Sequence, residues 1–235
     1  MALRVYGAQG VEYDFKASRQ RRDPYRHRFP RRDRRSFVIP ARSVPLIDCT
    51  VGDLLDRFAA KQPAPGGGAA AAITAAMAAG LLGMAARFST GQLIDSPRRA
   101  AHADRVRDQV AALAERDAEA YRAVLVAFAL PSEPDPEVRR RQIRRTLERA
   151  ARVPTEIAEA ASAIATEAVD LAERGNCNLR GDAFTAATLA AAAARSAAEL
   201  VRLNVELGDL GGDLVARAAH AADVAASAVV ALSSS

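Results

Sequence analysis

Gln62-Pro-Ala-Pro-Gly-Gly-Gly68 is the stretch that decides the fold, because it leads directly into a segment of small and apolar residues at 69–86. Its two prolines fix an extended approach, and its three glycines permit close backbone contacts that other residues obstruct. A helix made mostly of Ala, Gly, Met, Leu and Ile then begins at about residue 68. A helix that is apolar on every side must be covered by other helices, so the stretch predicts the buried central helix of a bundle.

The start of this helix carries no side chain that would cap it. Its free N–H groups and the positive end of its dipole suit an anionic group of a ligand. A P-loop requires Lys and then Ser or Thr after the last glycine, whereas Ala69-Ala70 follows here. We therefore expect an anion other than a nucleotide phosphate held with magnesium. The candidate ligand-binding residues of this turn are Pro65, Gly66, Gly67 and Gly68.

The composition supports the same fold class. Hydrophobic residues make up 50% of the 235 residues, aromatic residues only 5%, and there is no Trp. Such a core must be built from Ala, Leu and Val, which predicts an all-α helical bundle with closely approaching helices. Apolar periodicity predicts about seven helices and no strand, and leaves open whether Pro154 kinks a helix or starts a new one. The expected helices cover about 50–62, 68–88, 97–130, 136–152, 154–174, 182–207 and 213–232.

Charge divides the chain into two parts. Residues 1–45 hold twelve Lys or Arg against four Asp or Glu, a net charge of +8, whereas residues 46–235 have a net charge of −3. We expect a disordered basic arm followed by one helical domain at 46–235. The arm suits either binding to nucleic acid or an anionic surface, or a solvated extension without a role, which we favour. The acidic remainder argues against a nucleic-acid partner.

Cysteine usage and the N-terminus bear on the compartment. Cys49 and Cys177 have no CxxC spacing and no nearby His, so we expect no metal site and no disulfide framework. Charged residues stand where a secretion signal needs an apolar run, which favours a cytoplasmic protein. Residues 69–86 have the length of a marginal membrane span, but Ala and Gly gain little from lipid, so we expect no membrane contact.

Four stretches together resemble the formiminotetrahydrofolate cyclodeaminase and methenyltetrahydrofolate cyclohydrolase family. They are the proline-glycine stretch, Asp117-Ala-Glu-Ala-Tyr121, Gly175-Asn-Cys-Asn-Leu-Arg-Gly-Asp182 and Asn204-Val205, in the family's order. The resemblance extends from about Leu46 to the C-terminus. It implies a tetrahydrofolate derivative as substrate, no prosthetic group, and a homodimer that builds its folate cleft at the subunit interface.

Asp182 is the candidate catalytic residue. It stands where we expect the N-cap of a helix, and the free N–H groups there favour an ionised carboxylate. From the residues alone a plain cap is the alternative, but the resemblance implies a catalytic Asp at this place. Methenyltetrahydrofolate carries a delocalised cation, and a fixed carboxylate can stabilise that charge and take a proton from the attacking water.

Hydrolysis of methenyltetrahydrofolate to formyltetrahydrofolate is therefore the expected function. Formiminotetrahydrofolate cyclodeamination, which releases ammonia, is the enzymatic alternative, and a separate formiminotransferase domain would have favoured it. A folate-binding member without catalysis is the third possibility. Two departures from the family pattern support it: Gly181 replaces the usual Ser, and Glu206-Leu-Gly208 replaces a second Asn.

Five further residues are candidates for substrate binding. Asp117 is in phase with the apolar face of its helix, so its carboxylate either meets folate N–H donors or forms an ion pair with Arg116 or Arg122. The asparagines suit the pterin edge, with backbone bonding as the alternative. An arginine suits the glutamate carboxylates of folate, and Arg87 shares that chemistry. The remaining four candidates are Asn176, Asn178, Arg180 and Asn204.

Overall fold

The computed structural model describes residues 3–6, 12–15, 44–131 and 135–233. Within this part of the chain there are six α-helices, two short 3-10 helices and two short strands. The helices are α1 (Val51–Ala59), α2 (Gly67–Arg87), α3 (Ser96–Ala129), α4 (Pro136–Arg174), α5 (Arg180–Gly208) and α6 (Asp213–Ser233), with η1 (Leu46–Asp48) and η2 (Cys177–Leu179) between them.

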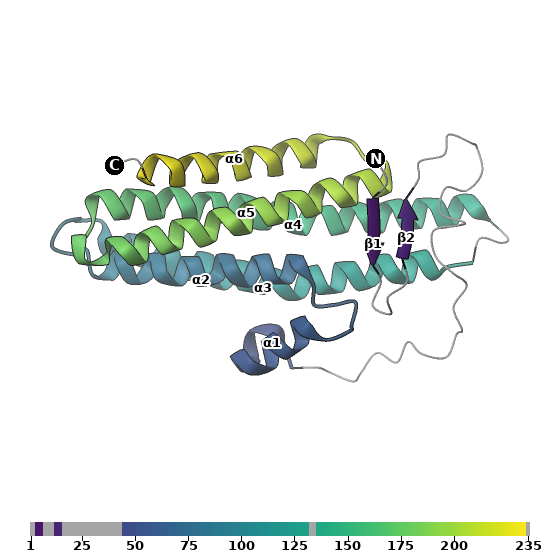
Figure 1. The fold of residues 1–235 in the computed structure, drawn as a ribbon, viewed down its shortest axis with the longest axis horizontal. Helices are drawn as coiled ribbons and strands as arrows, with labels where there is room; N and C mark the ends of the chain where they lie inside the picture. Colours follow the sequence, from purple (N-terminus) through teal and green to yellow (C-terminus); the bar gives the residue numbers. More distant parts are fainter. Residues whose placement is uncertain (1–2, 7–11, 16–43, 132–134, 234–235) are drawn as a thin grey trace.

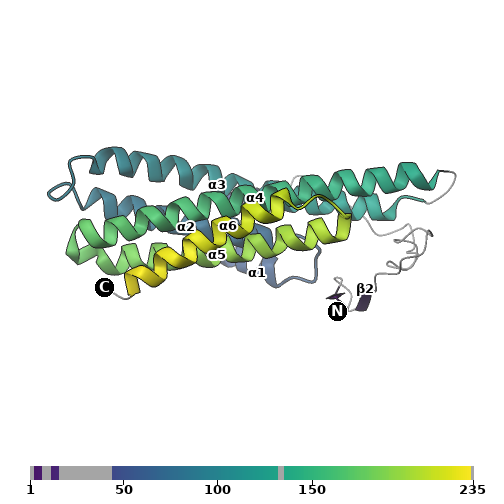
Figure 2. The same ribbon diagram turned by 90° about the horizontal axis from the view of Figure 1, so that it is seen from above.

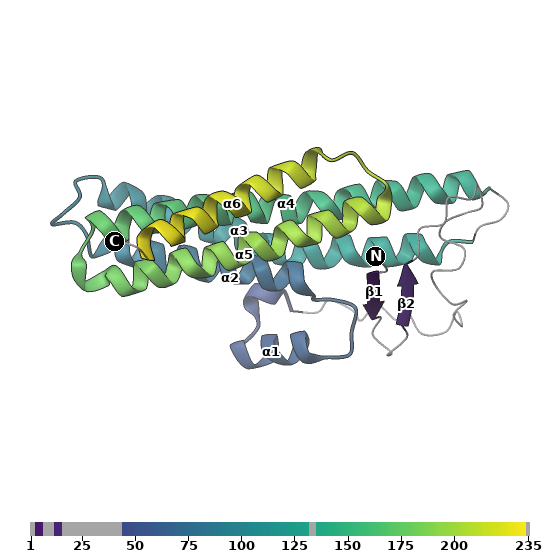
Figure 3. The ribbon, with the colours of Figure 1, turned by 45° about the horizontal axis from the view of Figure 1, so that its top comes forward.

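Helices α2 to α5 form an elongated four-helix bundle (Figure 1). Each packs on its neighbours in the order α2, α3, α4, α5, and α5 closes the square by packing on α2. Helix α6 runs along α4 and α5, and the short α1 lies beside the bundle near the start of α2 (Figure 3). The prediction of an all-α bundle is confirmed.

Alanine builds most of the core. In α2 the side chains of Ala69, Ala72, Ala75 and Ala78 are completely covered, as expected for helices whose backbones approach closely. By length and composition α2 and α6 would each suffice to cross a membrane, but most of the apolar stretch of α2 is buried inside the bundle, where a core helix belongs. One face of α2 stays open, and Met77 is 53% exposed there.

Helix α4 is continuous where the sequence left two helices possible, so the described part of the chain has six α-helices instead of about seven. Pro154 lies inside α4 and has no N–H to donate to the carbonyl of Ala150. The side-chain amide of Asn204, on α5, donates to that carbonyl at 3.0 Å. The contact between two helices thus replaces the hydrogen bond that proline removes.

The end of the bundle formed by the C-terminus of α3 and the N-terminus of α4 has a second small core, made of Val124, Ala127, Phe128, Ile143, Leu147 and Ala150. The buried Arg139 holds this end together. Its guanidinium donates to the carbonyls of Phe128 at 3.0 Å and Leu130 at 2.9 Å, so a cation caps the C-terminus of α3.

Most of residues 1–45 lie outside the described residues, and with them the predicted disorder of the arm. The described pieces are strands β1 (Leu3–Tyr6) and β2 (Glu12–Phe15), which pair antiparallel with Leu3 opposite Phe15. These strands differ from the expectation from sequence, which contains no strand. Both tetrapeptides contain tyrosine and apolar residues that favour strands, but they are too short to give a periodic signal.

Candidate functional site

The side chain of Asp117 packs against the glycine turn at the start of α2. Gly66 is the N-cap residue of α2 and has no side chain to cap it, and the preceding Ala64–Pro65 peptide bond is cis. The carboxylate of Asp117, on α3, accepts a hydrogen bond from the N–H of Ala69. A Cβ atom on Gly68 would overlap with this carboxylate. The sequence predicts a bare helix start, but a carboxylate of the chain itself occupies part of it.

Burial raises the pKa of Asp117 to about 6, and the hydrogen bond from Ala69 only partly opposes that effect. The predicted alternative, an ion pair with a neighbouring arginine, does not form: Arg116 binds Glu156 at 2.8 Å, and Arg122 lies 3.7 Å from Glu115. Of the two alternatives that the sequence leaves open, the carboxylate therefore points inward, toward the start of α2. Whether it contacts folate stays a prediction.

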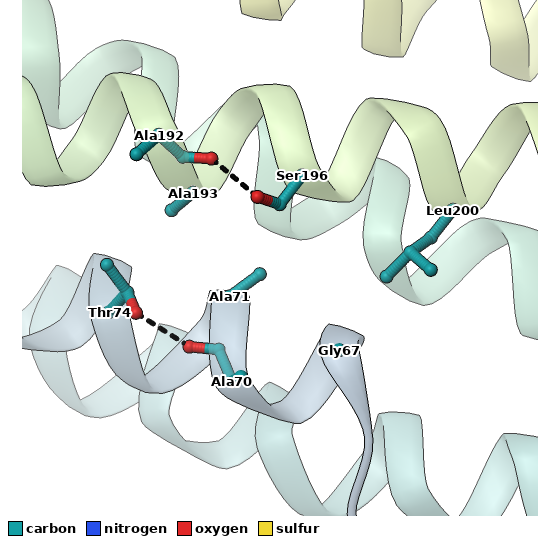
Figure 4. Close-up of a pocket in the computed structure, with 8 residues that line it drawn as sticks. All are labelled: Gly67, Ala70, Ala71, Thr74, Ala192, Ala193, Ser196 and Leu200. Carbon is teal, nitrogen blue, oxygen red and sulfur yellow. Dashed lines mark hydrogen bonds between the residues drawn. The ribbon is translucent and has the colours of Figure 1, made fainter.

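A groove of about 320 Å³ lies beside the glycine turn, between α2 and α5 (Figure 4). Its lining is small and mostly apolar, and its two hydroxyl groups are engaged within their own helices. Thr74 donates to the carbonyl of Ala70 at 2.8 Å, and Ser196 donates to that of Ala192 at 2.8 Å. The lining residues are Gly67, Ala70, Ala71, Thr74, Ala192, Ala193, Ser196 and Leu200.

A second polar network lies at the opposite end of α2. The fully buried hydroxyl of Ser89 donates to the carbonyl of Ala85 at 2.8 Å and accepts from the N–H of Asn176 at 2.9 Å. The Asn176 side chain donates to the carbonyl of Phe88 at 2.9 Å. A Cβ atom on Gly175 would lie 2.7 Å from the Ser89 hydroxyl, so glycine is required at this position. This network fixes the loop before α5 against the end of α2.

Asp182 sits in the first turn of α5 and is not its N-cap, which corrects the sequence prediction. The 3-10 helix η2 runs directly into α5, so Arg180 is already helical and Leu179 is the N-cap residue. The side chain of Asp182 is partly exposed and has no hydrogen-bond or ion-pair partner among the described residues. A carboxylate in the first turn still faces the positive end of the helix dipole.

The remaining predicted site residues lie in three different settings. Asn176 and Asn204 direct their side-chain amides to backbone carbonyls, as described above. Asn178 and Arg180 are exposed near Asp182, and their side chains have no partner among the described residues. Arg87 forms an ion pair with Asp104. Among the described residues, no three His, Cys, Asp or Glu side chains gather in a group that could hold a metal ion.

A single chain does not bring the glycine turn and Asp182 together. Helices α2 and α5 run antiparallel: a Cβ atom on Gly67 would lie 3.8 Å from Leu200, whereas Phe88 binds Asn176. Asp182 precedes Leu200 by 18 helical residues, which corresponds to about 27 Å along the axis. The two halves of the candidate site therefore stand at opposite ends of one helix pair.

Ser89 and Gly175 position the α5 turn, but no pattern in the sequence predicts this role. A serine after the expected end of a helix reads as a loop residue, and its partner Asn176 is 87 positions away. Only the antiparallel packing of α2 and α5 makes the contact. The single local signal was the glycine before the asparagine-containing loop.

Comparison with known proteins gives consistent matches. A family model described as formiminotransferase-cyclodeaminase matches residues 50–209. A methenyltetrahydrofolate cyclohydrolase of Methylorubrum extorquens is 32% identical over 167 residues, which cover 67% of this chain and 79% of that protein. The formimidoyltransferase-cyclodeaminase of Rattus norvegicus is 32% identical over 152 residues, but they cover 60% of this chain and 28% of that protein.

The fold also has a solved counterpart. The crystal structure of a formiminotetrahydrofolate cyclodeaminase from Thermotoga maritima superposes with a TM-score of 0.66. The match covers 80% of this chain and 93% of the other, at 24% sequence identity. It confirms the helical architecture.

Proposed function

Because the chain belongs to the formiminotransferase-cyclodeaminase family, we propose that it is an enzyme of folate one-carbon metabolism that hydrolyses methenyltetrahydrofolate to formyltetrahydrofolate. The Methylorubrum extorquens relative, which matches 67% of this chain and 79% of its own length, is named for this reaction. Cyclodeamination of formiminotetrahydrofolate is the second candidate, favoured by the 32% identity to the formimidoyltransferase-cyclodeaminase. In both reactions a tetrahydrofolate derivative is the substrate.

The observation that carries the proposal is the state of Asp182. Its carboxylate lies in the first turn of α5, partly exposed and without a partner among the described residues. Water adds to the cationic methenyl carbon and loses one proton, which leaves a hydroxyl on that carbon. One of its two carbon–nitrogen bonds then breaks, the hydroxyl proton passes to the departing nitrogen, and the carbon remains on the other nitrogen as a formyl group. A carboxylate beside that carbon lowers the energy of the cation and accepts the proton. The network of Ser89 and Asn176 holds the turn that carries this carboxylate.

We further propose that the active site forms between two copies of the chain. The side of α2 and α5 that carries the groove, called the open face of α2 and α5, has the glycine turn at one end. Asp182 lies at the other end, in helical phase with the lining residue Ala193 eleven positions later. A two-fold axis through the middle of this face would place the glycine turn of one protomer opposite the partner's Asp182. The exposed Met77 lies at the middle of α2 and would be covered there.

The decay of methenyltetrahydrofolate absorbance tests the reaction. Purified protein should accelerate the decay above the spontaneous rate. Asp182→Asn should lower kcat at least 100-fold, the usual effect of losing an acid–base group. Asp213→Asn, in the first turn of α6, is the matched control and should keep full activity. Ammonia release from formiminotetrahydrofolate, without acceleration of methenyl hydrolysis, would establish the second candidate instead.

If neither reaction is accelerated while folate still binds, the chain is a binding member of the family. Gly181→Ser, which restores the residue usual in the family, is then the first substitution to test. It should fit, because a Cβ atom at this position would have no neighbour within 4 Å. Gly208 differs, since a Cβ atom there would lie 2.9 Å from Leu210 and 3.2 Å from Leu147. Packing alone accounts for glycine at 208.

A further inference from the structure

We propose that an arginine-rich face on the N-terminal half of α4 binds the phosphate backbone of nucleic acid. The face is formed by Arg141, Arg144, Arg145 and Arg149 and is called the arginine face below. This inference does not depend on the proposed folate reaction, and its test has a different readout.

The charge of the helical domain is strongly segregated. Residues 136–152 contain seven arginines against two glutamates, a net charge of +5, although residues 46–235 as a whole carry −3. The expectation from sequence that nucleic acid is not a partner rested on that average. Once the α4 segment is considered by itself, the average no longer argues against a polyanion.

Three of the seven arginines have structural partners. Arg139 is buried against the end of α3, Arg140 lies 2.5 Å from Glu137, and Arg152 lies 2.7 Å from Glu148. The four arginines of the arginine face are exposed, and none has an acidic partner among the described residues. Four unpaired like charges on one short segment repel one another, and an external anion relieves that repulsion.

The four arginines share one side of α4. Arg141 is followed by the other three after three, four and eight positions, a spacing that places them along one stripe of the helix. The stripe leads into a groove of about 250 Å³ between α3 and α4, which Arg116, Arg149 and Arg152 line together with small residues such as Ala120. Two glutamates also line this groove, and one of them, Glu156, is already bound by Arg116 at 2.8 and 3.1 Å.

The arginine face is separate from the candidate active site. In the helix order of the bundle, the groove between α3 and α4 lies on the side opposite the open face of α2 and α5. The N-terminal part of α4 also extends beyond the end of α5 (Figure 2). A second copy covering α2 and α5 would leave the arginine face accessible.

Nucleic acid is the polyanion that these features fit best. Guanidinium groups bind phosphate with paired hydrogen bonds, and a row of them follows a phosphate chain without reading bases. No aromatic residue belongs to the stripe, so base stacking contributes nothing there and binding should not depend on sequence. The chain supplies a further net charge of +8 in residues 1–45, which would add to the same electrostatic attraction.

Fluorescence anisotropy of a labelled 20-nucleotide single-stranded RNA, titrated with the full chain at several salt concentrations, tests the proposal. The double variant Arg145→Gln with Arg149→Gln should bind roughly ten-fold more weakly and lower the salt slope by about 1.4, since each lost contact removes about 0.7. The matched control, Arg98→Gln with Arg105→Gln on α3, removes the same charge elsewhere and should change neither value. Methenyltetrahydrofolate hydrolysis and thermal unfolding should be the same in both variants.

Three results would overturn the proposal. One is equal weakening by the two double variants, which would mean that only net charge matters. Another is competition by poly-glutamate as effective as that by unlabelled RNA at equal charge, which would make the face a general anion surface. RNA binding that is unchanged in the α4 variant would assign the attraction to residues 1–45 and would also contradict it.

Discussion

At the scale of single residues, Gly68 and Asp117 depend on each other. The glycine lets the carboxylate reach the N-terminus of α2, and the carboxylate satisfies an N–H that no side chain of the turn can reach. Of the three glycines in the turn, this is the one that steric contact requires. A Cβ atom on Gly66 would meet nothing within 4 Å, and one on Gly67 would make an ordinary contact with Leu200 at 3.8 Å.

Gly68→Ala should therefore destabilise the protein by about 1–3 kcal/mol, because the added methyl group displaces the Asp117 carboxylate. Gly67→Ala is the matched control and should be neutral or slightly stabilising, since alanine favours a helix over glycine by about 1 kcal/mol. Urea unfolding of both variants measures the difference. Equal stability of the two variants would show that the carboxylate moves aside without cost.

The raised pKa of Asp117 predicts a pH dependence. A folded pKa of about 6, above the unfolded value, means that the group stabilises the protein at low pH and loses that contribution as pH rises through 6. The loss amounts to about 2–3 kcal/mol between pH 4 and pH 7.5. Asp117→Asn cannot titrate, so its stability relative to the wild type should increase by that amount over the same interval.

Urea unfolding of the wild type and of Asp117→Asn at several pH values gives this difference directly. Glu119→Gln, an exposed neighbour on the same helix, serves as the control and should show no such change. A constant difference between wild type and Asp117→Asn across the pH range would contradict the burial of an ionisable carboxylate behind the glycine turn.

At the scale of elements, α4 keeps its helical path through Pro154 because α5 supplies the missing donor. Asn204→Ala should cost about 1–3 kcal/mol, the usual penalty for leaving a carbonyl such as that of Ala150 unpaired. In a Pro154→Ala background the backbone N–H returns, and the same substitution should cost at least 1 kcal/mol less. Thermal unfolding of the four proteins in this cycle provides the coupling energy.

If the effects of the two substitutions on the free energy of unfolding are additive, Asn204 does not compensate for the proline. That result would favour its predicted role in substrate binding. Activity separates the two roles further. A residue that acts only on α4 should change stability and leave KM unaltered at a temperature where both proteins are folded.

At the scale of the whole molecule, the proposed shared site predicts that activity requires a dimer. Met77→Glu places a charge at the middle of the open face of α2, so it should produce monomers and abolish hydrolysis. Val224→Glu, on α6, adds the same charge at another partly exposed apolar position and should leave the dimer and the rate of hydrolysis unchanged. Sedimentation velocity combined with the absorbance assay checks this, and an active Met77→Glu monomer would contradict a shared site.

The amino-acid sequence by itself determined the fold class and most helix boundaries. Small residues at 69–86 can be buried only by close helix packing. At the start of α1 the Thr50 hydroxyl accepts a hydrogen bond from the N–H of Asp53, three residues later, at 3.1 Å. It also identified the glycine turn and placed Asp117 in phase with the apolar face of its helix. These features depend on neighbours within one or two helical turns, which a sequence displays directly.

Only the tertiary structure decided how distant segments complete one another. The continuity of α4 depends on Asn204, fifty positions after Pro154, and the α5 turn depends on Ser89, 87 positions before Asn176. The N-cap residue of α5 is Leu179 instead of Asp182, because η2 continues directly into the helix. Hydrogen bonds between residues far apart in the chain, and the sides on which charges gather, arise from helix packing, which local patterns do not encode.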